Sequence, residues 1–327
     1  MEKSKRKIFA AISLLFICGL VFGWYVGWKR GVPFVKTQLN SWAIGIFSGE
    51  SPMSFATSPG LKNPVLTYKD VTDIRATFVA DPFMVYEKDT WYLFFEAMEK
   101  DTGKGDIAVA TSKDGIHWKY QKVVLREPFH LSYPYVFKWK NEYYMLPETK
   151  RAYSVRLYKA VNFPFKWEFV GNLLNNVGYV DSSLFYVHNK WWMFTTSGKK
   201  QFLNLHLYYA DHLRGPWTEH PKSPVVRDNP NTARCGGRVL VIDGKIIRYA
   251  QDDHPKYGNK IRLFEIVELT TTNFEEKELK QFSVPKSDRI AWNKDGMHNI
   301  DAHQLSKNQW IAVMDGYGKE YVYGLRY

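Results

Sequence analysis

Disulfide bonds cannot stabilise this chain to any large extent, because its 327 residues include only two cysteines. Cys18 lies in an apolar N-terminal run and Cys235 lies far along the chain, so the two are not expected to pair. No Asn-x-Ser/Thr sequon occurs, which favours a bacterial periplasmic setting over a eukaryotic secretory lumen. The protein is expected to be stabilised by its apolar core alone.

Basic runs and metal-ligand motifs are also scarce. The formal net charge is +12, but beyond the N-terminal residues the basic side chains are scattered. This pattern excludes a nucleic-acid stripe and indicates at most an anionic partner. No spacing such as His-Glu-x-x-His appears, so neither a catalytic metal nor another cofactor is predicted.

One uncharged apolar run, Ile8–Trp28, has the length of a membrane helix. A cleaved signal peptide is the alternative, but it would end in small residues, whereas here the bulky Trp24, Tyr25 and Trp28 continue the run. Lysine and arginine precede the run, which favours a cytoplasmic N-terminus and an extracytoplasmic domain. Residues 1–30 are therefore predicted to be a cytoplasmic tip and a single transmembrane anchor.

The rest of the chain repeats one phrase at a spacing of about fifty residues. Its clearest copy is DPFMVYEKDTWYLFFE, in which an acid opens a β-rich run, a polar turn follows, and a second aromatic run ends on a polar group. The five copies cover Asp81–Glu96, Tyr133–Glu148, Asp181–Thr196, Gly236–Gln251 and Asp301–Asp315. The last copy is one residue shorter than the others.

Each copy predicts a β-hairpin, and most copies are followed by a second pair of β-rich runs. Three of these pairs carry a tryptophan, Trp118, Trp167 and Trp217, at intervals of 49 and 50 residues. Four strands per repeat indicate a five-bladed β-propeller over residues 80–327, preceded by a lead-in over residues 31–79 that packs on it or closes the ring. A β-sandwich with chance similarity is the alternative.

Equivalent positions of propeller blades converge near the central channel, so the polar ends of the repeats are expected to meet. Asp81, Asp181 and Glu148 are the predicted catalytic residues, because two carboxyl groups can activate a nucleophile and protonate a leaving oxygen at a glycosidic bond. Aromatic residues nearby could stack on a sugar, although aromatic residues commonly fill blade interfaces. The predicted substrate-binding residues are Glu96, His130, Tyr133, Arg234, Gln251, Asp252, Asp301 and His303. Arg234 or Arg238 could clamp a substrate carboxylate or phosphate.

The motifs FVADPF, WYLFFE, EPFHLSYPYVF, YYMLPET, VDSSLF, ARCGGR and RYAQD carry a resemblance to a known family. From about Trp42 to Gly316 the chain resembles the N-terminal, propeller-like domain of plant glucosamine inositolphosphorylceramide transferases and their bacterial relatives. That domain is itself similar to glycoside hydrolase family 43. The resemblance implies a carbohydrate-active fold whose partner is an oligosaccharide, a polysaccharide or a glycolipid.

Within that resemblance, Asp81 matches the base of family 43 and Asp181 matches its orienting aspartate. The family's acid comes after the second aspartate, whereas the candidate here, Glu148, comes before it. Because of this departure, sugar transfer is as compatible with the sequence as hydrolysis. A non-catalytic glycan-binding module is the alternative function. Some similar propellers hold a structural Ca²⁺ ion in the channel, for which Asp301 and His303 would be the nearest ligands here.

Overall fold

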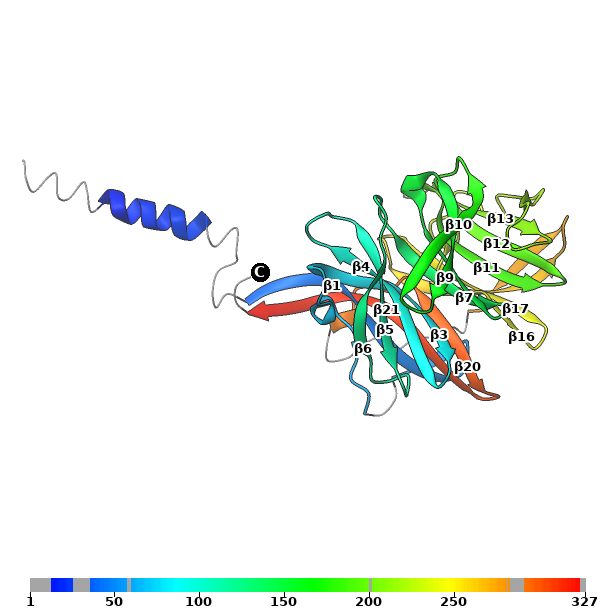
Figure 1. Cartoon of the computed structure of the whole chain (residues 1–327), viewed down its shortest axis with the longest axis horizontal. Coiled ribbons are helices and arrows are strands. Elements are labelled where there is room, and N and C mark those ends of the chain that lie inside the picture. Colours follow the sequence, from blue (N-terminus) through cyan, green and yellow to red (C-terminus); the bar gives the residue numbers. More distant parts are fainter. Residues whose placement is uncertain are drawn as a thin grey trace, which may run out of the picture. The chain divides into compact units, whose positions relative to one another are not determined.

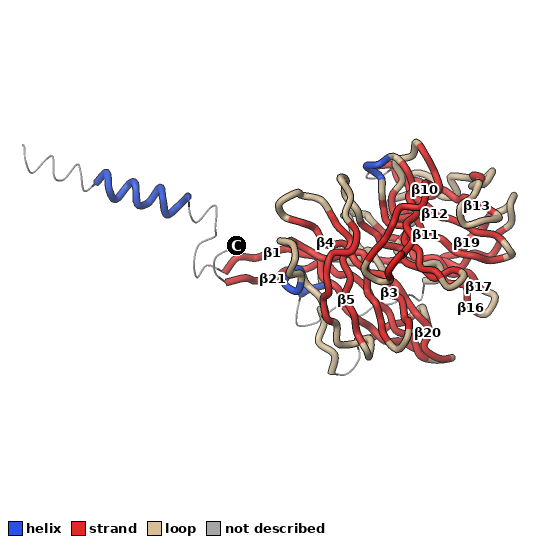
Figure 2. The backbone as a smooth tube through the Cα atoms, in the orientation of Figure 1, coloured by secondary structure: helices blue, strands red, loops and turns tan. Residues whose placement is uncertain are grey.

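The computed structural model describes residues 13–25, 36–57, 60–199, 202–280, 282 and 291–323. Ser41–Gly318 form one compact unit, and the chain ends, Met1–Asn40 and Lys319–Tyr327, form another. Strands make up most of the described chain (Figure 2).

Residues 13–25 form an α-helix with exposed apolar side chains, among them Leu15, Phe16 and Phe22. The helix lies inside the predicted anchor Ile8–Trp28, and the remainder of that run lies outside the described residues. Across the described ranges, no helix combines the length and the apolar character needed to cross a membrane. The transmembrane anchor stays a prediction from the sequence.

The compact unit contains five antiparallel sheets, and the first three follow the chain in order (Figure 1). The first sheet contains β3 (Ala76–Glu87), β4 (Thr90–Glu99), β5 (Gly105–Ser112) and β6 (Lys119–Leu125). The second contains β7 (Ser132–Trp139), β8 (Glu142–Glu148), β9 (Ser154–Asn162) and β10 (Lys166–Asn175). The third contains β11 (Val180–Val187), β12 (Lys190–Lys199), β13 (Phe202–Ala210) and β14 (Thr218–Glu219).

The last two sheets depart from this regular order. The fourth contains β15 (Arg234–Cys235), β17 (Lys245–Asp252), β18 (Lys260–Leu269) and β19 (Phe274–Glu278), with β16 (Leu240–Ile242) also paired to β17. The fifth has the order β2 (Ser54–Ala56), β1 (Lys36–Ser51), β21 (Gln309–Tyr323) and β20 (Ile300–Ser306). Three short 3₁₀ helices are η1 (Tyr68–Asp70), η2 (Lys150–Ala152) and η3 (Ala291–Asn293).

The fifth sheet joins the two ends of the described β domain, because β1 and β2 extend the sheet of β20 and β21. Residues of the expected lead-in thus supply two of its four strands. The five sheets confirm the five-bladed propeller, and they exclude the β-sandwich alternative.

Tight turns explain why each repeat folds as a hairpin. Two successive residues have positive φ at the hairpin tips, as a type I′ turn requires. These pairs are Lys88–Asp89, Lys140–Asn141, His188–Asn189 and Asp243–Gly244. The three repeated tryptophans also share one local role, since each indole N–H donates to a carbonyl three or four residues upstream, at Gly115, Pro164 and Leu213.

Aromatic side chains fill the interfaces between neighbouring blades. Trp167 of the second blade lies edge-on to Phe94 of the first, with ring centroids 5.6 Å apart. Trp191 of the third blade lies 4.7 Å from Trp139 of the second. Trp191 and its neighbour Trp192 are both buried, so these aromatic residues belong to the core.

A β-bulge marks the start of the innermost strand in the first three blades. The bulged residues Asp81, Tyr133 and Asp181 have φ of 53°, 45° and 51°, a left-handed conformation that bulky residues rarely adopt. The pairing register shifts at this point in all three blades. The strain indicates that these positions are held by their surroundings.

The fifth blade lacks this bulge, which explains its shorter repeat. Asp315 pairs next to Asn299, and the register then runs on evenly, with Ile300 opposite Met314 and Asp301 opposite Val313. Asp301 therefore occupies the position that Phe83 has in the first blade, farther down the strand than Asp81. The alignment of Asp301 with Asp81 in the repeat does not hold in the structure.

Candidate functional site

Four carboxyl groups from the first three blades lie within electrostatic reach of one another. They belong to Asp81 on β3, Glu96 on β4, Glu148 at the end of β8 and Asp181 on β11. The charges of Asp81, Glu148 and Asp181 all contribute to raising the pKa of Glu96. The repeat geometry thus brings the three predicted catalytic residues together with Glu96.

Strand pairing explains this convergence. Glu96 pairs opposite Ala80, directly before Asp81, and Glu148 pairs opposite Ser132, directly before Tyr133. In the first two blades, the bulged residue and the closing carboxyl group of the hairpin thus lie at the same end of the blade. Because the blades are arranged around one axis, these ends gather at one end of the channel.

Burial and mutual repulsion raise the pKa of two of these carboxyl groups to near neutral pH. Burial is the main cause that raises the pKa of Asp81 to about 7, and the charges of Asp181 and Asp315 add to it while His298 opposes it. Burial also raises the pKa of Glu148 to about 8, with Asp181 adding to the effect and Arg234 opposing it. Two carboxyl groups therefore titrate near neutral pH, which suits proton transfer.

Asp181 is fixed by groups of the fourth blade. Arg234 Nε lies 2.5 Å from Asp181 Oδ2, and Gln251 Nε2 donates to the same oxygen over 3.0 Å. The guanidinium also lies 3.6 Å from Asp253 Oδ2 and stacks 5.0 Å from the ring centre of Tyr257. Arg234 and Gln251, both predicted to bind substrate, hold an acid of the site, and their contact with substrate stays a prediction.

Asp81 is fixed by the first, second and fifth blades. Tyr133 N donates to Asp81 Oδ2 over 3.2 Å, and Asp81 N donates to Asp315 Oδ2 over 3.1 Å. His298 Nδ1 lies 2.6 Å from Asp315 Oδ2 and 3.6 Å from Asp81 Oδ1. Burial would lower the pKa of His298, but Asp315 and Asp81 outweigh it and raise the pKa to about 9. His298 is therefore a cation at neutral pH, and it lies between the carboxyl groups of Asp81 and Asp315.

One ligand atom from each of Asp81, His298 and Asp315 lies within 4.8 Å of the others, a spacing that a metal ion could bridge. However, a protonated His298 already supplies the positive charge between the carboxylates. The ring of Trp42 stacks on the imidazole with centroids 4.0 Å apart, which covers that face. Without a metal ion these three residues form an ion-pair network, and an ion bound there would have to displace the proton of His298.

On the side of the first blade, the partly buried His130 lies next to the buried Glu96. His130 Nδ1 accepts the Gly105 N–H over 2.8 Å, and Nε2 lies 3.5 Å from Glu96 Oε1. Burial, together with the charge of Arg151, lowers the pKa of His130 to about 4, so the ring is neutral. Burial is also the largest cause that raises the pKa of Glu96 well above its usual value. His130 thus brings no positive charge to the site at neutral pH, and the burial of Glu96 favours the protonated form of its carboxyl group.

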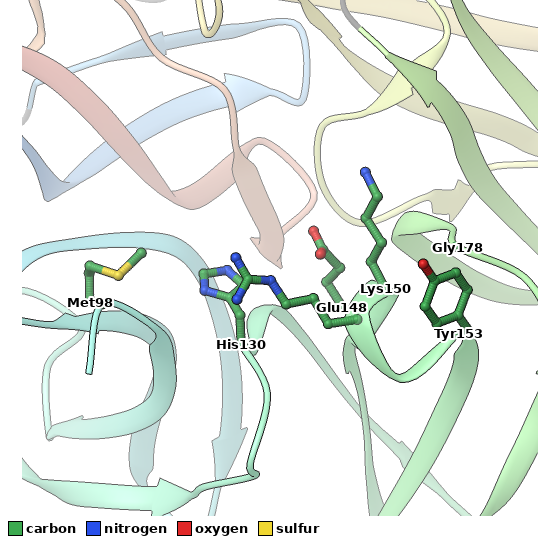
Figure 3. A pocket seen from close by; sticks show the side chains of 8 residues that line it. Met98, His130, Glu148, Lys150, Tyr153 and Gly178 are labelled. Carbon is green, nitrogen blue, oxygen red and sulfur yellow. The ribbon is translucent and has the colours of Figure 1, made fainter.

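A pocket of about 700 Å³ opens beside these acids. Figure 3 shows the Glu148 carboxyl group and the Lys150 side chain extending into the same space, with Tyr153 on one side and His130 on the other. The pocket is lined by Met98, Gly103, His130, Glu148, Lys150, Arg151, Tyr153 and Gly178. Its volume suits a small ligand or one to a few sugar rings.

Four of the predicted substrate-binding residues, Tyr133, Asp252, Asp301 and His303, do not line the pocket. Tyr133 is fully buried, and its hydroxyl bonds with Ser183 Oγ over 2.8 Å and with the backbone of Gly237. Asp252 is buried and accepts from Asn231 and Arg262. The structure does not bring these two side chains to the pocket.

Asp301 and His303 lie farther down the channel. Asp301 is fully buried and its oxygens accept from Arg238 Nε over 2.6 Å, from Met84 N over 2.6 Å and from His303 Nε2 over 2.9 Å. Arg238, the second candidate substrate clamp, also donates to Val136 O over 2.9 Å. A Ca²⁺ ion at Asp301 and His303 stays a prediction, and such an ion would have to replace contacts of Arg238.

Several residues of the site were not predicted from the sequence. Asp315 had a signal, because it closes the fifth repeat as Glu96 and Glu148 close the first two. Trp42 and His298 had none in the repeat, since they come from the strand that closes the ring and from the segment before β20. The lining residues Lys150, Arg151 and Tyr153 lie in and after η2, outside the repeated phrase.

Comparison with known proteins agrees with the resemblance seen in the motifs. The chain is 38% identical over 309 residues to glucosamine inositolphosphorylceramide transferase 1 of Oryza sativa subsp. japonica, covering 88% of this chain. It is 34% identical over 298 residues to the Arabidopsis thaliana protein of that name, covering 85% of this chain. These matches span 41% and 39% of the two plant proteins, so the chain corresponds to less than half of their length.

A solved structure extends the comparison at the level of fold. A family 117 glycoside hydrolase from Zobellia galactanivorans superposes with a TM-score of 0.52 at 14% identity, covering 73% of this chain and 84% of that one. The family model for glucosamine inositolphosphorylceramide transferase 1, N-terminal, matches residues 36–317, which is nearly all of the described β domain. The chain therefore belongs to the glucosamine inositolphosphorylceramide transferase 1 N-terminal family.

Proposed function

We propose that this protein is a carbohydrate-active enzyme that acts on glycosidic bonds, as a hydrolase or as a glycosyl transferase. The observation that carries the proposal is the set of buried carboxyl groups beside the pocket, two of which titrate near neutral pH. Perturbed carboxyl groups in a cleft are typical of acid–base sites.

Each acid has surroundings that suit a different role. Glu148 lines the pocket and holds its proton at neutral pH, so it can act as the general acid toward the leaving oxygen. Asp81, beside the cation of His298, can act as the base that activates the incoming hydroxyl or water. Asp181, paired with Arg234, supplies a fixed carboxylate that orients the substrate and the acid.

The substrate proposed is an oligosaccharide, a polysaccharide or a glycolipid. The plant relatives are named glucosamine inositolphosphorylceramide transferase 1, a name that combines an amino sugar with a ceramide lipid. This chain matches less than half of the length of the plant proteins, so the activity in their name is only a proposal for this chain.

A glycan-binding module without catalysis is the second candidate, and one observation favours it. Asp81 and Asp181 are only 6% and 1% exposed, and neither lines the pocket. A substrate would reach Glu148 directly, but it would need some opening of the site to reach Asp81.

The test compares the full chain with its Asp81→Asn variant on a panel of oligosaccharides, activated sugars and aryl glycosides. Loss of the base is expected to lower turnover by about 10²- to 10⁴-fold while ligand binding is retained. Equal turnover in both proteins would remove Asp81 from the mechanism. Binding without turnover in either protein would favour the glycan-binding module.

We also propose that Ile8–Trp28 anchors the protein in a membrane, with the propeller outside the cytoplasm. The support is the uncharged apolar run and the basic residues before it. The full chain is expected in the membrane fraction and to resist extraction by carbonate, whereas a chain that begins at residue 31 should not. Recovery of the full chain in the supernatant would contradict the anchor.

A further inference from the structure

The segment after Glu148 presents two cations and an aromatic ring to the pocket. Lys150 and Arg151 lie in η2, Tyr153 follows it, and all three line the pocket (Figure 3). Tyr153 is 69% exposed, an unusual state for a large aromatic side chain on rigid backbone. An exposed aromatic ring at a pocket rim offers a flat apolar face for a ligand.

The backbone of this segment is held in place before any ligand binds. Tyr153 has a φ of 50°, a conformation that a bulky residue adopts only where its surroundings impose it. The buried Thr149 hydroxyl donates to Ser154 O over 2.5 Å and accepts from Arg156 N over 3.3 Å. Val177 N donates to Tyr153 O over 3.0 Å. The strained turn is thus fixed from both sides, as a recognition element requires.

Lys150 and Arg151 differ from the other cations of the site because no acid among the described residues forms an ion pair with them. Arg234 pairs with Asp181, Arg238 with Asp301 and His298 with Asp315. In the described part of the chain, the side chains of Lys150 and Arg151 make neither a hydrogen bond nor an ion pair. The nearest acid in sequence, Glu148, holds its proton at neutral pH and so does not neutralise them. Two free cations beside an open pocket favour an anion there.

We infer that the pocket takes a glycan that carries an anionic group, a carboxylate or a phosphate, bound by Lys150 and Arg151, with a sugar ring against Tyr153. The inference rests on the proposed function and narrows its substrate class to acidic sugars. It makes Lys150 and Arg151 residues that determine specificity.

The two cations could instead serve only to reduce repulsion among the buried acids. The two roles predict different results. Cations that bind the ligand should matter for anionic sugars alone, whereas cations that balance the acids should affect neutral and anionic sugars equally.

The test measures binding of matched sugars to the full chain by calorimetry and ligand-observed NMR. The probes are glucose, galactose and mannose, their uronates and their sugar phosphates, with inorganic phosphate as a further probe. The parent is expected to bind the anionic member of one set about tenfold more tightly than the neutral member, and Lys150→Gln/Arg151→Gln should remove that preference. The uronate and phosphate arms show which anion is preferred.

Lys140→Gln is the matched control. Lys140 is exposed and lies at the hairpin tip at the opposite end of β8, about 20 Å away by strand geometry. This variant should bind like the parent. Equal binding of neutral and anionic sugars by the parent would overturn the inference and leave the proposed function intact. An equal loss for both kinds of sugar in the double variant would also overturn it. If no sugar of either kind binds, the proposed function fails with it.

Discussion

Replacing Glu148 with glutamine is expected to lower turnover of glycosides with poor leaving groups by about 10²- to 10⁴-fold. Glutamine keeps the size of the side chain but cannot donate a proton to the leaving oxygen. Aryl glycosides with good leaving groups need no such proton, so the variant should retain most of its activity on them. A comparison of the two substrate classes in steady-state kinetics separates the role of the acid from a general loss of structure.

The pH profile gives the second measurement on the same variant. Activity needs Glu148 protonated and Asp81 ionised, so the parent should lose activity as the pH rises past about 8 and as it falls below about 7. Because the charges of the two acids influence each other, the two apparent pKa values of the pH profile describe the pair and not each residue alone. Glu148→Gln should remove the alkaline limb and keep the acidic one.

Although Glu148→Gln should lose activity, it should gain stability at alkaline pH. The pKa of Glu148 in the folded protein, about 8, lies above its ordinary value of 4.5, so the folded state favours the protonated acid. That contribution is complete below the ordinary value and is lost as the pH rises through 8. Glutamine mimics the neutral acid, and the variant should melt at a higher temperature than the parent at pH 9.

Glu142→Gln is the control, since Glu142 lies on the same strand at the opposite end, paired with Lys159 at the surface. It should leave both the pH profile and the substrate preference unchanged. An unchanged alkaline limb in Glu148→Gln would exclude Glu148 as the acid. The proposal would then need another proton donor, and Glu96 would be the next candidate.

The repeat made both the blade count and the main acids predictable from sequence. Asp81 and Asp181 occupy equivalent bulges, and Glu148 closes a hairpin, so one alignment of the repeats placed all three at one end of the channel. The alignment failed where the fifth repeat lost its bulge. Because the fifth repeat is one residue shorter, Asp301 lies farther down the channel than Asp81. At that position it contacts other protein groups and does not reach the pocket.

Partners from different blades explain most of what sequence could not give. Arg234 and Gln251 were recognised as polar residues near the channel, but only the structure shows that both contact Asp181. The pairing of His298 with Asp81 depends on how the ring closes, which no local pattern encodes. The acids could therefore be found from periodicity, whereas the groups that set their protonation could not.

The largest expected effect on stability comes from Arg238, whose guanidinium connects the fourth blade to three others. Its nitrogens contact Asp301 at 2.6 and 3.2 Å, Val136 O at 2.9 Å and Met84 O at 3.4 Å. Arg238→Met would leave the fully buried Asp301 with His303 as its remaining basic partner, and breaking a buried pair costs about 3–5 kcal/mol. Urea unfolding at pH 7, followed by tryptophan fluorescence, measures the change in the free energy of unfolding.

A double-mutant cycle identifies the source of that loss. Arg238→Met/Asp301→Leu removes both charges, and the double variant should be much more stable than the sum of the single losses predicts, because no buried charge is left unpaired. Lys190→Met is the control, since its pair with Asp211 lies at the surface and should contribute far less.

Acid provides an independent check on the same ion pair. Burial alone would raise the pKa of Asp301, but Arg238 and His303 outweigh it and hold the pKa well below its ordinary value of 3.8. The ion pair therefore contributes its stability above that ordinary value and loses it as the pH falls toward the depressed one. The gap between the parent and Arg238→Met should narrow below about pH 4. A loss under about 1 kcal/mol in Arg238→Met at pH 7, or additive losses in the cycle, would show that the four blades are held together without this ion pair.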